Sequence, residues 1–282
     1  MPELQDVTPD GLYTPEVGRW SLDKYRLVGM YDALFAKGMK HRWDCRVYLD
    51  LFCGPGRARI RGTTRVVETS PLRALRIPDP FDKYIFCDEC PKAIDALRQR
   101  VVCDFPAIDV VYIVGDCNRL VGEIIAQIHK VSRTRKVLSF CFLDPYGIST
   151  LKLSTIRALS RFRMDFLILL ALAMDANRFQ SRYVLETNQA VDEFLDDSSW
   201  RDKWHGLRLQ RTDFRRFLAQ QFAAQMTTLD YLRTGMETMK EIRSDEKNLP
   251  LYHLAFFSKH ERGYEFWEQV RKYSTDQRGL FD

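Results

Sequence analysis

The chain has 282 residues, of which 45% are hydrophobic and 29% charged, and its formal net charge is +5. This composition is that of a soluble globular protein, and the length allows one large domain or two small ones. The longest apolar run, Phe166 to Met174, is about half the length that spans a bilayer, so no membrane-spanning helix is predicted. The mild positive charge permits a nucleic-acid partner without requiring one.

The N-terminus and the cysteines bear on the compartment. Residues 1–6 lack the basic and apolar regions of a signal peptide. Seven cysteines, an odd number, in a chain without an export signal predict free thiols in a reducing compartment, and we expect a cytoplasmic protein. Cys87 and Cys90 have the spacing of a metal knuckle, but no second such pair accompanies them. Because tetrahedral sites need four ligands, no metal site is predicted.

The first quarter of the chain leads into a buried strand. We predict an irregular segment over residues 1–20 and then a helix that Ser21 caps and that runs to about Lys37, with Gly38 as its end. Residues 1–45 thus form a helical lead-in. The apolar run 47–52 reads as a strand that breaks into a turn with two glycines. Residues 57–69 look like a basic loop, and Ser70-Pro71 opens a short helix.

From residue 84 onward, short apolar runs alternate with amphipathic helical patterns. This alternation predicts βαβ units and a parallel sheet covered on both faces. Residues 175–210 break the rhythm and predict a helical insertion. The predicted strands are 84–87, 110–114, 137–143 and 166–171, the helices between them are 91–102, 118–131 and 151–162, and a helix at 213–229, a hairpin of 236–243 with 251–257 and a helix at 261–273 complete the chain.

Five parallel strands followed by a helix and an antiparallel pair are the strand inventory of class I S-adenosylmethionine-dependent methyltransferases. We therefore predict one α/β domain over residues 1–282 with a Rossmann-like methyltransferase fold. Its sheet would be mostly parallel and seven-stranded, with helices on both faces and the insertion at 175–210.

Four loops that follow predicted strands offer what a nucleoside-containing cofactor needs. The turn after the first strand suits the amino-acid end of S-adenosylmethionine, because glycine leaves backbone accessible. A carboxylate after the second strand can accept both ribose hydroxyls, and Asp116 can take the adenine amine. Each loop alone is better explained as structural, because carboxylates often cap helices, but four such loops in register at the edge of the sheet favour a cofactor site. The predicted cofactor residues are Asp50, Phe52, Gly54, Gly56, Asp88, Glu89, Asp116, Cys117, Asn118 and Asp144.

The spacing of the acids disfavours a nicotinamide dinucleotide. Asp88 follows Asp50 by 38 residues, whereas a dinucleotide fingerprint places the acid about 20 residues on and adds a third glycine. The basic loop and the short helix fill the difference. S-adenosylmethionine is therefore the predicted cofactor, with S-adenosylhomocysteine as the product.

The tetrapeptide Asp144-Pro145-Tyr146-Gly147 carries the predicted chemistry. It resembles the Asp/Asn-Pro-Pro-Tyr/Phe loop of methyltransferases that act on exocyclic amines of bases, and more closely the corresponding loop of tRNA guanine-N2 methyltransferases. Hydrogen bonds from the amine to the Asp144 carboxylate and the Pro145 carbonyl would localise the nitrogen lone pair, and Tyr146 could stack on the base. These three residues are the predicted catalytic residues, and an ordinary Asp-Pro turn is the alternative.

Three basic stretches are candidates for nucleic-acid contact, and each could equally be a solvated face. The first is the loop with Arg57, Arg59, Arg61 and Arg65. The second is 133–136, and the third is the insertion with Arg178, Arg182, Arg201, Lys203 and Trp204. The position of residues 258–263 relative to the active-site face is left open by the sequence.

These motifs together resemble the three-Cys-motif partner (TcmP) family over nearly the whole chain. The resemblance implies a class I methyltransferase-like fold and pairing with a protein that carries a three-cysteine, radical-enzyme-like motif. Any iron–sulfur cluster would then belong to that partner. The residues that carry the resemblance are Lys24, 48–56, 70–75, 142–147 and 252–260.

The sequence thus favours a methyltransferase acting on an exocyclic amine of a nucleobase in RNA or DNA. Two alternatives remain open. One is a methyltransferase-like binding subunit that positions a substrate for the three-Cys-motif partner. The other is methylation of a protein or a small molecule, with which the same loop is chemically compatible.

Overall fold

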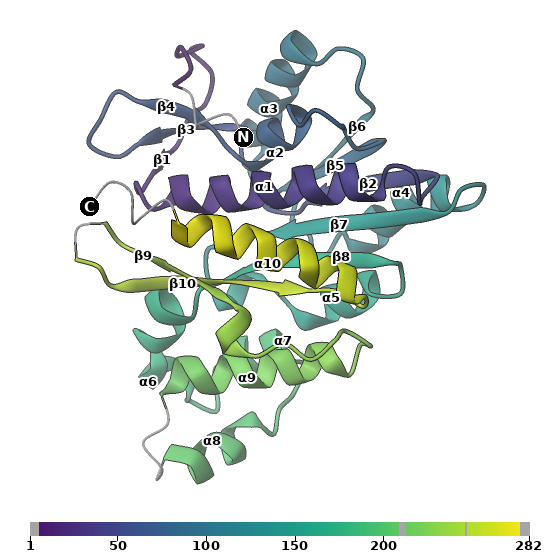
Figure 1. The fold of residues 1–282 in the computed structure, drawn as a ribbon. Helices are drawn as coiled ribbons and strands as arrows, with labels where there is room; N and C mark the ends of the chain where they lie inside the picture. The colour runs from purple at the N-terminus through teal and green to yellow at the C-terminus, as the bar shows by residue number, and fades with distance from the viewer. Residues whose placement is uncertain (1–5, 209–212, 246, 277–282) are drawn as a thin grey trace.

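A computed structural model describes residues 6–208, 213–245 and 247–276, and a seven-stranded sheet runs through the middle of this structure (Figure 1). The neighbouring strands β6, β5, β2, β7 and β8 are parallel. β10 is antiparallel to β8, and β9 is antiparallel to β10. The strands in spatial order are β6 (Val110–Val114), β5 (Lys83–Asp88), β2 (Cys45–Asp50), β7 (Val137–Leu143), β8 (Met164–Leu170), β10 (Pro250–Phe257) and β9 (Lys240–Arg243).

This strand order confirms the predicted fold class, a Rossmann-like methyltransferase sheet with a terminal antiparallel pair. From β2, the chain first adds β5 and β6 on one side and then adds β7 and β8 on the other. The order therefore reverses between β2 and β7, and open α/β sheets bind their ligands at such a point, beyond the carboxyl ends of the strands. We call this side the carboxyl end of the sheet and the opposite side its amino end.

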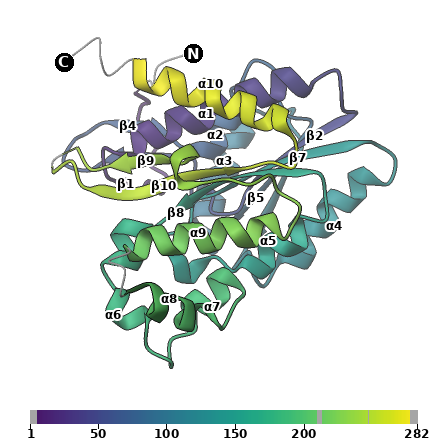
Figure 2. The same ribbon diagram turned by 60° about the horizontal axis from the view of Figure 1, so that its bottom comes forward.

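Helices cover both faces of the sheet (Figure 2). One layer packs on the face that carries Tyr48, Phe140 and Phe256, and the other packs on the face that carries Val47 and Phe166. The first layer consists of α1 (Ser21–Met39), α2 (Ser70–Leu75), α3 (Pro91–Asp104) and α10 (Glu261–Asp276), and the second includes α4 (Val121–Ser132), α5 (Leu153–Leu159), α7 (Ala190–Leu195) and α9 (Phe214–Thr227).

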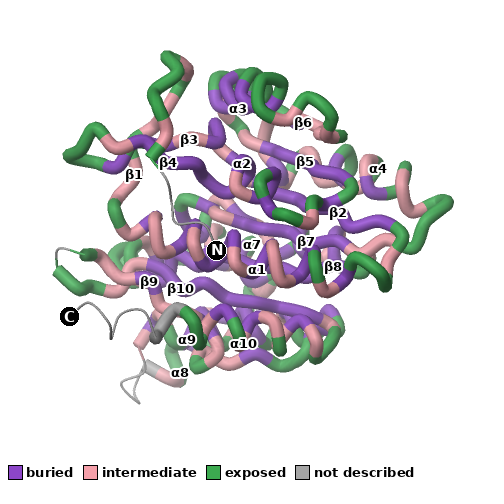
Figure 3. The backbone as a smooth tube through the Cα atoms, turned by 45° about the horizontal axis from the view of Figure 1, so that its top comes forward, coloured by how far each residue is buried: buried purple, intermediate pink, exposed green. Residues whose placement is uncertain are grey.

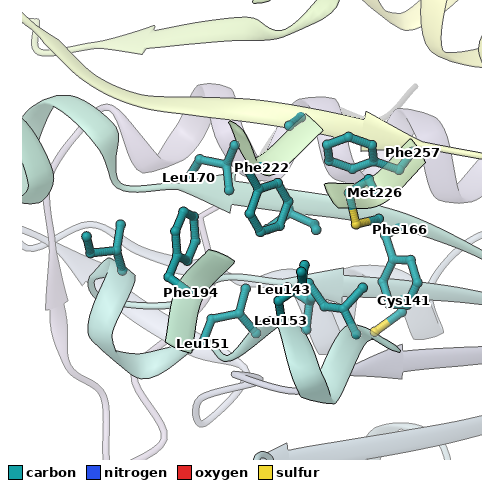
Figure 4. Close-up of a cluster of buried hydrophobic side chains, with 14 of the residues drawn as sticks. Cys141, Leu143, Leu151, Leu153, Phe166, Leu170, Phe194, Phe222, Met226 and Phe257 are labelled. Atoms are coloured by element: carbon teal, nitrogen blue, oxygen red, sulfur yellow. The ribbon is translucent and has the colours of Figure 1, made fainter. Parts of the chain in front are cut away.

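The central strands are buried on both sides, as their near-continuous apolar runs predict (Figure 3). Successive side chains alternate between the two layers, since residues along a strand point to opposite faces. In the second layer, Leu143 and Phe166 from the sheet meet Phe194 and Phe222 from α7 and α9 (Figure 4). This packing fixes the strand ends, and with them the loops that build the site.

Residues 57–69 are not the loop that the sequence predicts but mostly an antiparallel hairpin, β3 (Arg57–Ile60) with β4 (Val66–Glu68). Ala58 and Ile60 are buried, whereas Arg59 is exposed. The period of two was hidden in the sequence by the arginines and by the short length of each strand. A further strand, β1 (Glu16–Val17), lies in the predicted irregular lead-in and pairs with β3.

The first helix begins and ends differently from the prediction. Ser21 is the first residue of α1 rather than its cap, and its hydroxyl makes no hydrogen bond to a described residue. Gly38 lies inside the helix. A Cβ at this position would be 2.4 Å from the ring of Phe266 in α10, so glycine allows the two helices to approach closely rather than ending α1.

Short helices occupy the region between β8 and α9. They are a π-helix (Leu172–Asn177), α6 (Gln180–Tyr183), α7 and α8 (Trp200–Arg208), and short 3-10 helices at Ile148–Thr150 and Met236–Thr238 flank other elements. Trp204, which the sequence suggests for nucleic-acid contact, is buried against Phe214 and Phe217 instead. Within the described residues, every helix is too short or too polar to cross a membrane.

Candidate active site at the carboxyl end of the sheet

Two cavities lie side by side at the carboxyl end of the sheet. The acidic cavity, of about 220 Å³, is lined by the loops that follow β5, β6 and β7. The aromatic cavity, of about 260 Å³, lies between the start of α1, the glycine turn after β2 and the loop after β7. Phe52 and Tyr146 line both cavities and form the boundary between them. A ligand that occupies both would therefore pass these two side chains.

In the acidic cavity, the pair after β5 divides into an anchored and a free carboxylate. Asp88 accepts hydrogen bonds from the backbone amides of Gly54, at 2.8 Å, and Cys90, at 2.9 Å. It therefore joins the glycine turn to the next strand, while keeping lone pairs for a further donor. Glu89 lines the same cavity and is exposed. Of the two residues, Glu89 has the freer carboxylate for ribose hydroxyls.

The loop after β6 shows a similar division. Asp116 accepts hydrogen bonds from the backbone and the side-chain amide of Asn118, both through Oδ1. Asn118 also donates to the Thr150 carbonyl and accepts from the Lys152 amide, so its side chain joins this loop to the one after β7. Cys117 lines the cavity with a buried side chain. The second oxygen of Asp116 lies 3.8 Å from the exposed Arg119 and can also accept a hydrogen bond from a ligand, whereas Asn118 shapes the wall.

Glycine is required for different physical reasons at the two glycine positions of the turn after β2. Both have positive φ, +60° at Gly54 and +84° at Gly56, which disfavours other residues. An added Cβ at Gly54 meets nothing within 4 Å, and this residue lines the aromatic cavity. At Gly56 it would lie 2.8 Å from Leu72 and Leu97. Gly54 therefore leaves room at the cavity as predicted, whereas Gly56 allows α2 and α3 to pack against the turn.

Asp50 lies behind the site and lines neither cavity. Its carboxyl group is fully buried, accepts a hydrogen bond from the Phe52 amide, and has an Oδ2 without a hydrogen-bond partner among the described residues. Burial raises the pKa of Asp50 to about 7, a hydrogen bond from Ser70 opposes this, and repulsion from Asp144 adds to it. Asp50 is placed to influence a ligand through its charge rather than by contact.

The centre of the aromatic cavity is an ion pair between α1 and the loop after β7. The Lys24 ammonium lies 2.5 Å from Oδ2 of Asp144, and only 4% of the Lys24 side chain is exposed. Burial alone would lower the pKa of Lys24, but the adjacent Asp144 carboxylate outweighs it and raises this pKa above its ordinary value. Lys24 is therefore a fixed cation that orients Asp144 and leaves its other oxygen for a substrate.

Aromatic rings surround this ion pair. The Lys24 ammonium lies 5.3 Å from the ring centroid of Trp20 and 4.6 Å from that of Tyr25, distances at which a cation is attracted to a ring face. Trp20 in turn packs against Tyr252 of β10, with 4.7 Å between the ring centroids and 30° between the ring planes. Tyr146 is 83% exposed. The cavity thus offers a flat aromatic wall and one accessible ring.

The π-helix after β8 supports the loop that carries Asp144. Asp175 accepts a hydrogen bond from the Ile148 amide through one carboxylate oxygen and from the Tyr183 hydroxyl through the other, each at 2.8 Å. Gly147 allows this contact, because a Cβ there would lie 2.5 Å from Asp175. Pro145 is buried in the same wall. The loop is therefore held rigidly from the side opposite to Lys24.

Two hydroxyl groups in the aromatic cavity show whether its lining suits the amino-acid end of S-adenosylmethionine. Ser21 and Thr69 line the cavity near Gly54, and both hydroxyl oxygens are buried without a hydrogen-bond partner among the described residues. Buried polar groups normally have partners. The ammonium and carboxylate of the amino-acid end of S-adenosylmethionine would supply them, so the residues present fit this cofactor.

Most arginines of the predicted basic loop are paired with acids of the N-terminal segment. Arg57 lies 2.8 Å from Asp10, Arg59 lies 2.9 Å from Glu16, and Arg65 pairs with Asp6. Arg61 is exposed and lines the aromatic cavity, as does Arg57. The hairpin is therefore less cationic than its sequence suggests.

A buried arginine that the sequence did not identify fastens the N-terminal segment to the site. Arg100 of α3 donates to both carboxylate oxygens of Asp10 and, at 2.6 Å, to the carbonyl of Pro55 in the glycine turn. Its hydrogen bond to Asp10 is the main reason that the pKa of Asp10 falls to about 2. Arg100 thus joins three separate segments at the back of the aromatic cavity.

Sequence reasoning also gave no role to Lys24, Trp20 or Tyr252. Lys24 appears in the sequence only as part of a family resemblance, and 120 residues separate it from Asp144. A charged residue within an apolar helical pattern, next to two aromatic residues, is the one local signal that could have marked it. For Trp20 and Tyr252, only the position of β10 beside the site reveals their proximity.

Comparison with known proteins gives distant structural likenesses. No protein-family model and no curated protein sequence matches the chain at a significant level. The chain is similar to Trm1 from Pyrococcus horikoshii in complex with S-adenosyl-L-methionine, with 14% identity and a TM-score of 0.46, covering 94% of this chain and 64% of that one. The chain is also similar to the Legionella pneumophila protein LPL1258, described by the family model DUF519. The identity is 14% and the TM-score 0.40, and the match covers 62% of this chain and 75% of that one. Because both TM-scores are below 0.5, the methyltransferase-like fold assigned to this chain rests on its strand order.

Proposed function

We propose that the protein is an S-adenosylmethionine-dependent methyltransferase that acts on an exocyclic amine of a nucleobase in RNA or DNA. The observation that carries this proposal is the pair of adjoining cavities at the switch point of the sheet, with Asp144 in one and Asp88, Glu89 and Asp116 in the other. When bound, the cofactor supplies a methyl group on a sulfonium and leaves as S-adenosylhomocysteine.

The residues of the acidic cavity would hold the adenosine part of the cofactor. Glu89 and Asp88 are placed for the ribose hydroxyls, and Asp116 for the adenine amine. Gly54, Ser21 and Thr69 would receive the amino-acid end. This division follows from where free carboxylates, accessible backbone and unpartnered hydroxyls are found.

Asp144 would act on the acceptor. An aromatic amine is a poor nucleophile because its lone pair is delocalised into the ring. A hydrogen bond from the amine to the free oxygen of Asp144 localises that lone pair, and a preorganised, partly buried carboxylate is effective in this role. Lys24 holds the Asp144 carboxylate in place, and Tyr146 offers an exposed ring on which the base can stack.

Membership in the three-Cys-motif partner family and association with a three-Cys-motif protein belong to the same proposal. The motifs that carry this resemblance are those that build the site, namely the glycine turn, the Asp144 loop and Lys24. Methylation of a protein or a small molecule uses the same loop, and the exposed Tyr146 ring favours a planar base over these acceptors.

Calorimetric titration with S-adenosylmethionine and S-adenosylhomocysteine tests the cofactor site, followed by transfer of a labelled methyl group to tRNA, rRNA and DNA. We expect binding of both compounds and incorporation into a nucleic acid. Absence of binding up to millimolar concentrations would reject the enzyme and favour a substrate-binding subunit, whose partner would then be sought by co-purification. Binding with incorporation only into protein would reject the nucleobase acceptor.

A further inference from the structure

A third cavity, of about 420 Å³, lies at the amino end of the sheet, across the strands from the site described above. It forms where α1 ends, where β7 and β8 begin, and where β10 leads into α10. In Figure 1 this region is at the right, whereas the β3–β4 hairpin of the carboxyl end is at the left. The topology thus places residues 258–263, whose position the sequence left open, behind the active-site face.

Five cationic side chains line this cavity, which we call the basic cavity, and they come from four separate segments. None of them forms an ion pair with a described residue, in contrast to Arg57, Arg59 and Arg65 of the hairpin. Such an unneutralised group of charges is costly in self-repulsion and favours an anionic ligand. The five residues are Arg42, Lys136, Arg163, Lys259 and Arg262.

Trp43 holds two of these cations at the cavity. The Lys136 ammonium lies 4.7 Å from the centroid of its ring, and the Arg163 guanidinium lies 5.8 Å from it. Lys259 is held from another side by a hydrogen bond to the Ser160 carbonyl, at 2.9 Å. Three of the five cations are therefore positioned by contacts within the protein.

The acid that lines the cavity does not neutralise them. Asp165 is buried beneath the cations and accepts a hydrogen bond from the Tyr31 hydroxyl at 3.2 Å. Burial raises the pKa of Asp165 to about 7, so a large share of this carboxyl group is uncharged at neutral pH. Two further acids lie close: Asp44 accepts from the backbone amide of Lys136, and Asp230 interacts electrostatically with Lys259.

Apolar side chains form the rest of the wall. Met39, Trp43, Leu138 and Met164 line the cavity beside the cations. Three of the cations are arginines, whose planar guanidinium groups match phosphate oxygens in pairs. A ligand that is both phosphorylated and partly flat and apolar fits this combination, and the volume lies in the range of pockets for such small molecules.

We propose that the basic cavity binds the phosphate and base of a nucleotide, either as a free nucleotide or as one unit of a single-stranded RNA. This inference does not depend on the proposed methyl transfer, because it rests on a different end of the sheet and on different residues. If both proposals hold, the protein contacts nucleotides at two opposite ends of one sheet.

The test is binding of a short, fluorescein-labelled single-stranded RNA, measured by fluorescence anisotropy as a function of salt. The variant is Arg163→Gln combined with Lys136→Gln, since both side chains are exposed and their loss should leave the fold intact. We expect roughly ten-fold weaker binding and a salt dependence whose slope falls by about 1.4, at ~0.7 for each lost phosphate contact. Thermal unfolding monitors the fold of each protein.

The matched control is Lys130→Gln combined with Lys272→Gln, which removes the same charge from exposed positions outside the cavity. Equal losses in both double variants, or unchanged binding in the Arg163→Gln and Lys136→Gln protein, would overturn the proposal. Competition with adenosine monophosphate, tripolyphosphate and unlabelled RNA distinguishes a free nucleotide from one unit of a single-stranded RNA as the ligand. Displacement of the labelled RNA by adenosine monophosphate assigns the site to free nucleotides. Displacement only by unlabelled RNA assigns it to one unit of a single-stranded RNA. Displacement by tripolyphosphate alone contradicts a role for the base.

Discussion

The two ends of the sheet treat positive charge in opposite ways. At the carboxyl end, the arginines of the hairpin pair with acids of the N-terminal segment, and Lys24 is buried against Asp144. At the amino end, five cations surround the basic cavity without forming an ion pair with an acid among the described residues. The same residue types thus build a rigid scaffold at one end and an open electrostatic site at the other.

The difference shows that a basic stretch of sequence does not identify a nucleic-acid contact by itself. Arg57 and Arg59 are among the predicted contact residues, yet each is engaged with an acid. Lys136 lies in the predicted basic stretch 133–136, whereas Arg163 lies outside the three predicted stretches, and the two become neighbours only through the sheet. What decides the role of a cation is the number of acids that the fold brings near it.

The largest effect is expected at Asp144. Asp144→Asn keeps an oxygen near Lys24 but removes the negative charge that localises the lone pair of the acceptor, so kcat for methyl transfer should fall by roughly 10²–10³-fold with little change in cofactor affinity. Single-turnover kinetics and calorimetry measure the two quantities. Asp144→Ala is a poorer test, because it removes the hydrogen-bond acceptor of the buried Lys24 ammonium together with the charge. Loss of cofactor binding in a folded Asp144→Asn protein would place Asp144 in the cofactor site instead.

The Gly56→Ala substitution tests the packing of the carboxyl end. A Cβ at φ +84° and 2.8 Å from Leu72 and Leu97 combines backbone strain with overpacking, and we expect a loss of ~2–4 kcal/mol in the free energy of unfolding. Gly62→Ala is the control, because φ there is +75° but nothing lies within 4 Å of the added atom. Denaturant unfolding of both proteins measures the difference. Equal losses would show that strain alone accounts for the effect.

Each end of the sheet also contains one buried acid with a pKa of about 7, Asp50 and Asp165. An acid with a raised pKa in the folded state stabilises the protein most below its unfolded pKa of ~3.9, and this contribution is lost as pH rises towards 7. The unsubstituted protein should therefore lose free energy of unfolding between pH 5 and pH 8. Asp50→Asn and Asp165→Asn should each lose ~2–4 kcal/mol less than the unsubstituted protein over this range. Denaturant unfolding at both pH values measures this difference.

Cofactor affinity distinguishes these two acids. S-adenosylmethionine carries positive charge, so its binding should strengthen as Asp50 ionises between pH 6 and pH 8. Asp50→Asn should flatten this pH dependence, whereas Asp165→Asn should leave it unchanged. Calorimetry at several pH values compares the three proteins. The same flattening in both variants would contradict the separation of the two ends.

The smallest effect is expected at Tyr146. Its ring is 83% exposed, so Tyr146→Ala should leave the free energy of unfolding within ~0.5 kcal/mol of the original value. Loss of stacking should raise KM for a nucleic-acid substrate by roughly ten-fold, with a smaller change in kcat. Steady-state kinetics provide the readout, and Tyr146→Phe should restore KM. A failure of phenylalanine to restore it would point to the hydroxyl group rather than to stacking.

The sequence by itself determined the elements and the loops that carry acids. Apolar runs such as 110–114 and 137–143 matched strands to the residue, because a strand buried on both faces leaves a continuous local signal. The Asp144 loop was likewise visible, since its chemistry lies in adjacent residues. Short or charged elements give no such local signal. The sequence of the β3–β4 hairpin therefore predicts a loop, although the segment forms two paired strands.

Only the tertiary structure decided which side chains meet. Lys24 and Asp144 are 120 residues apart, and Arg100 reaches Asp10 and Pro55 across 90 and 45 residues of the chain. The basic cavity depends on the same long-range order, because antiparallel β10 returns the chain to the amino end of the sheet. Local patterns encode how a segment folds, whereas the charge balance of a site depends on contacts between segments that are distant in sequence.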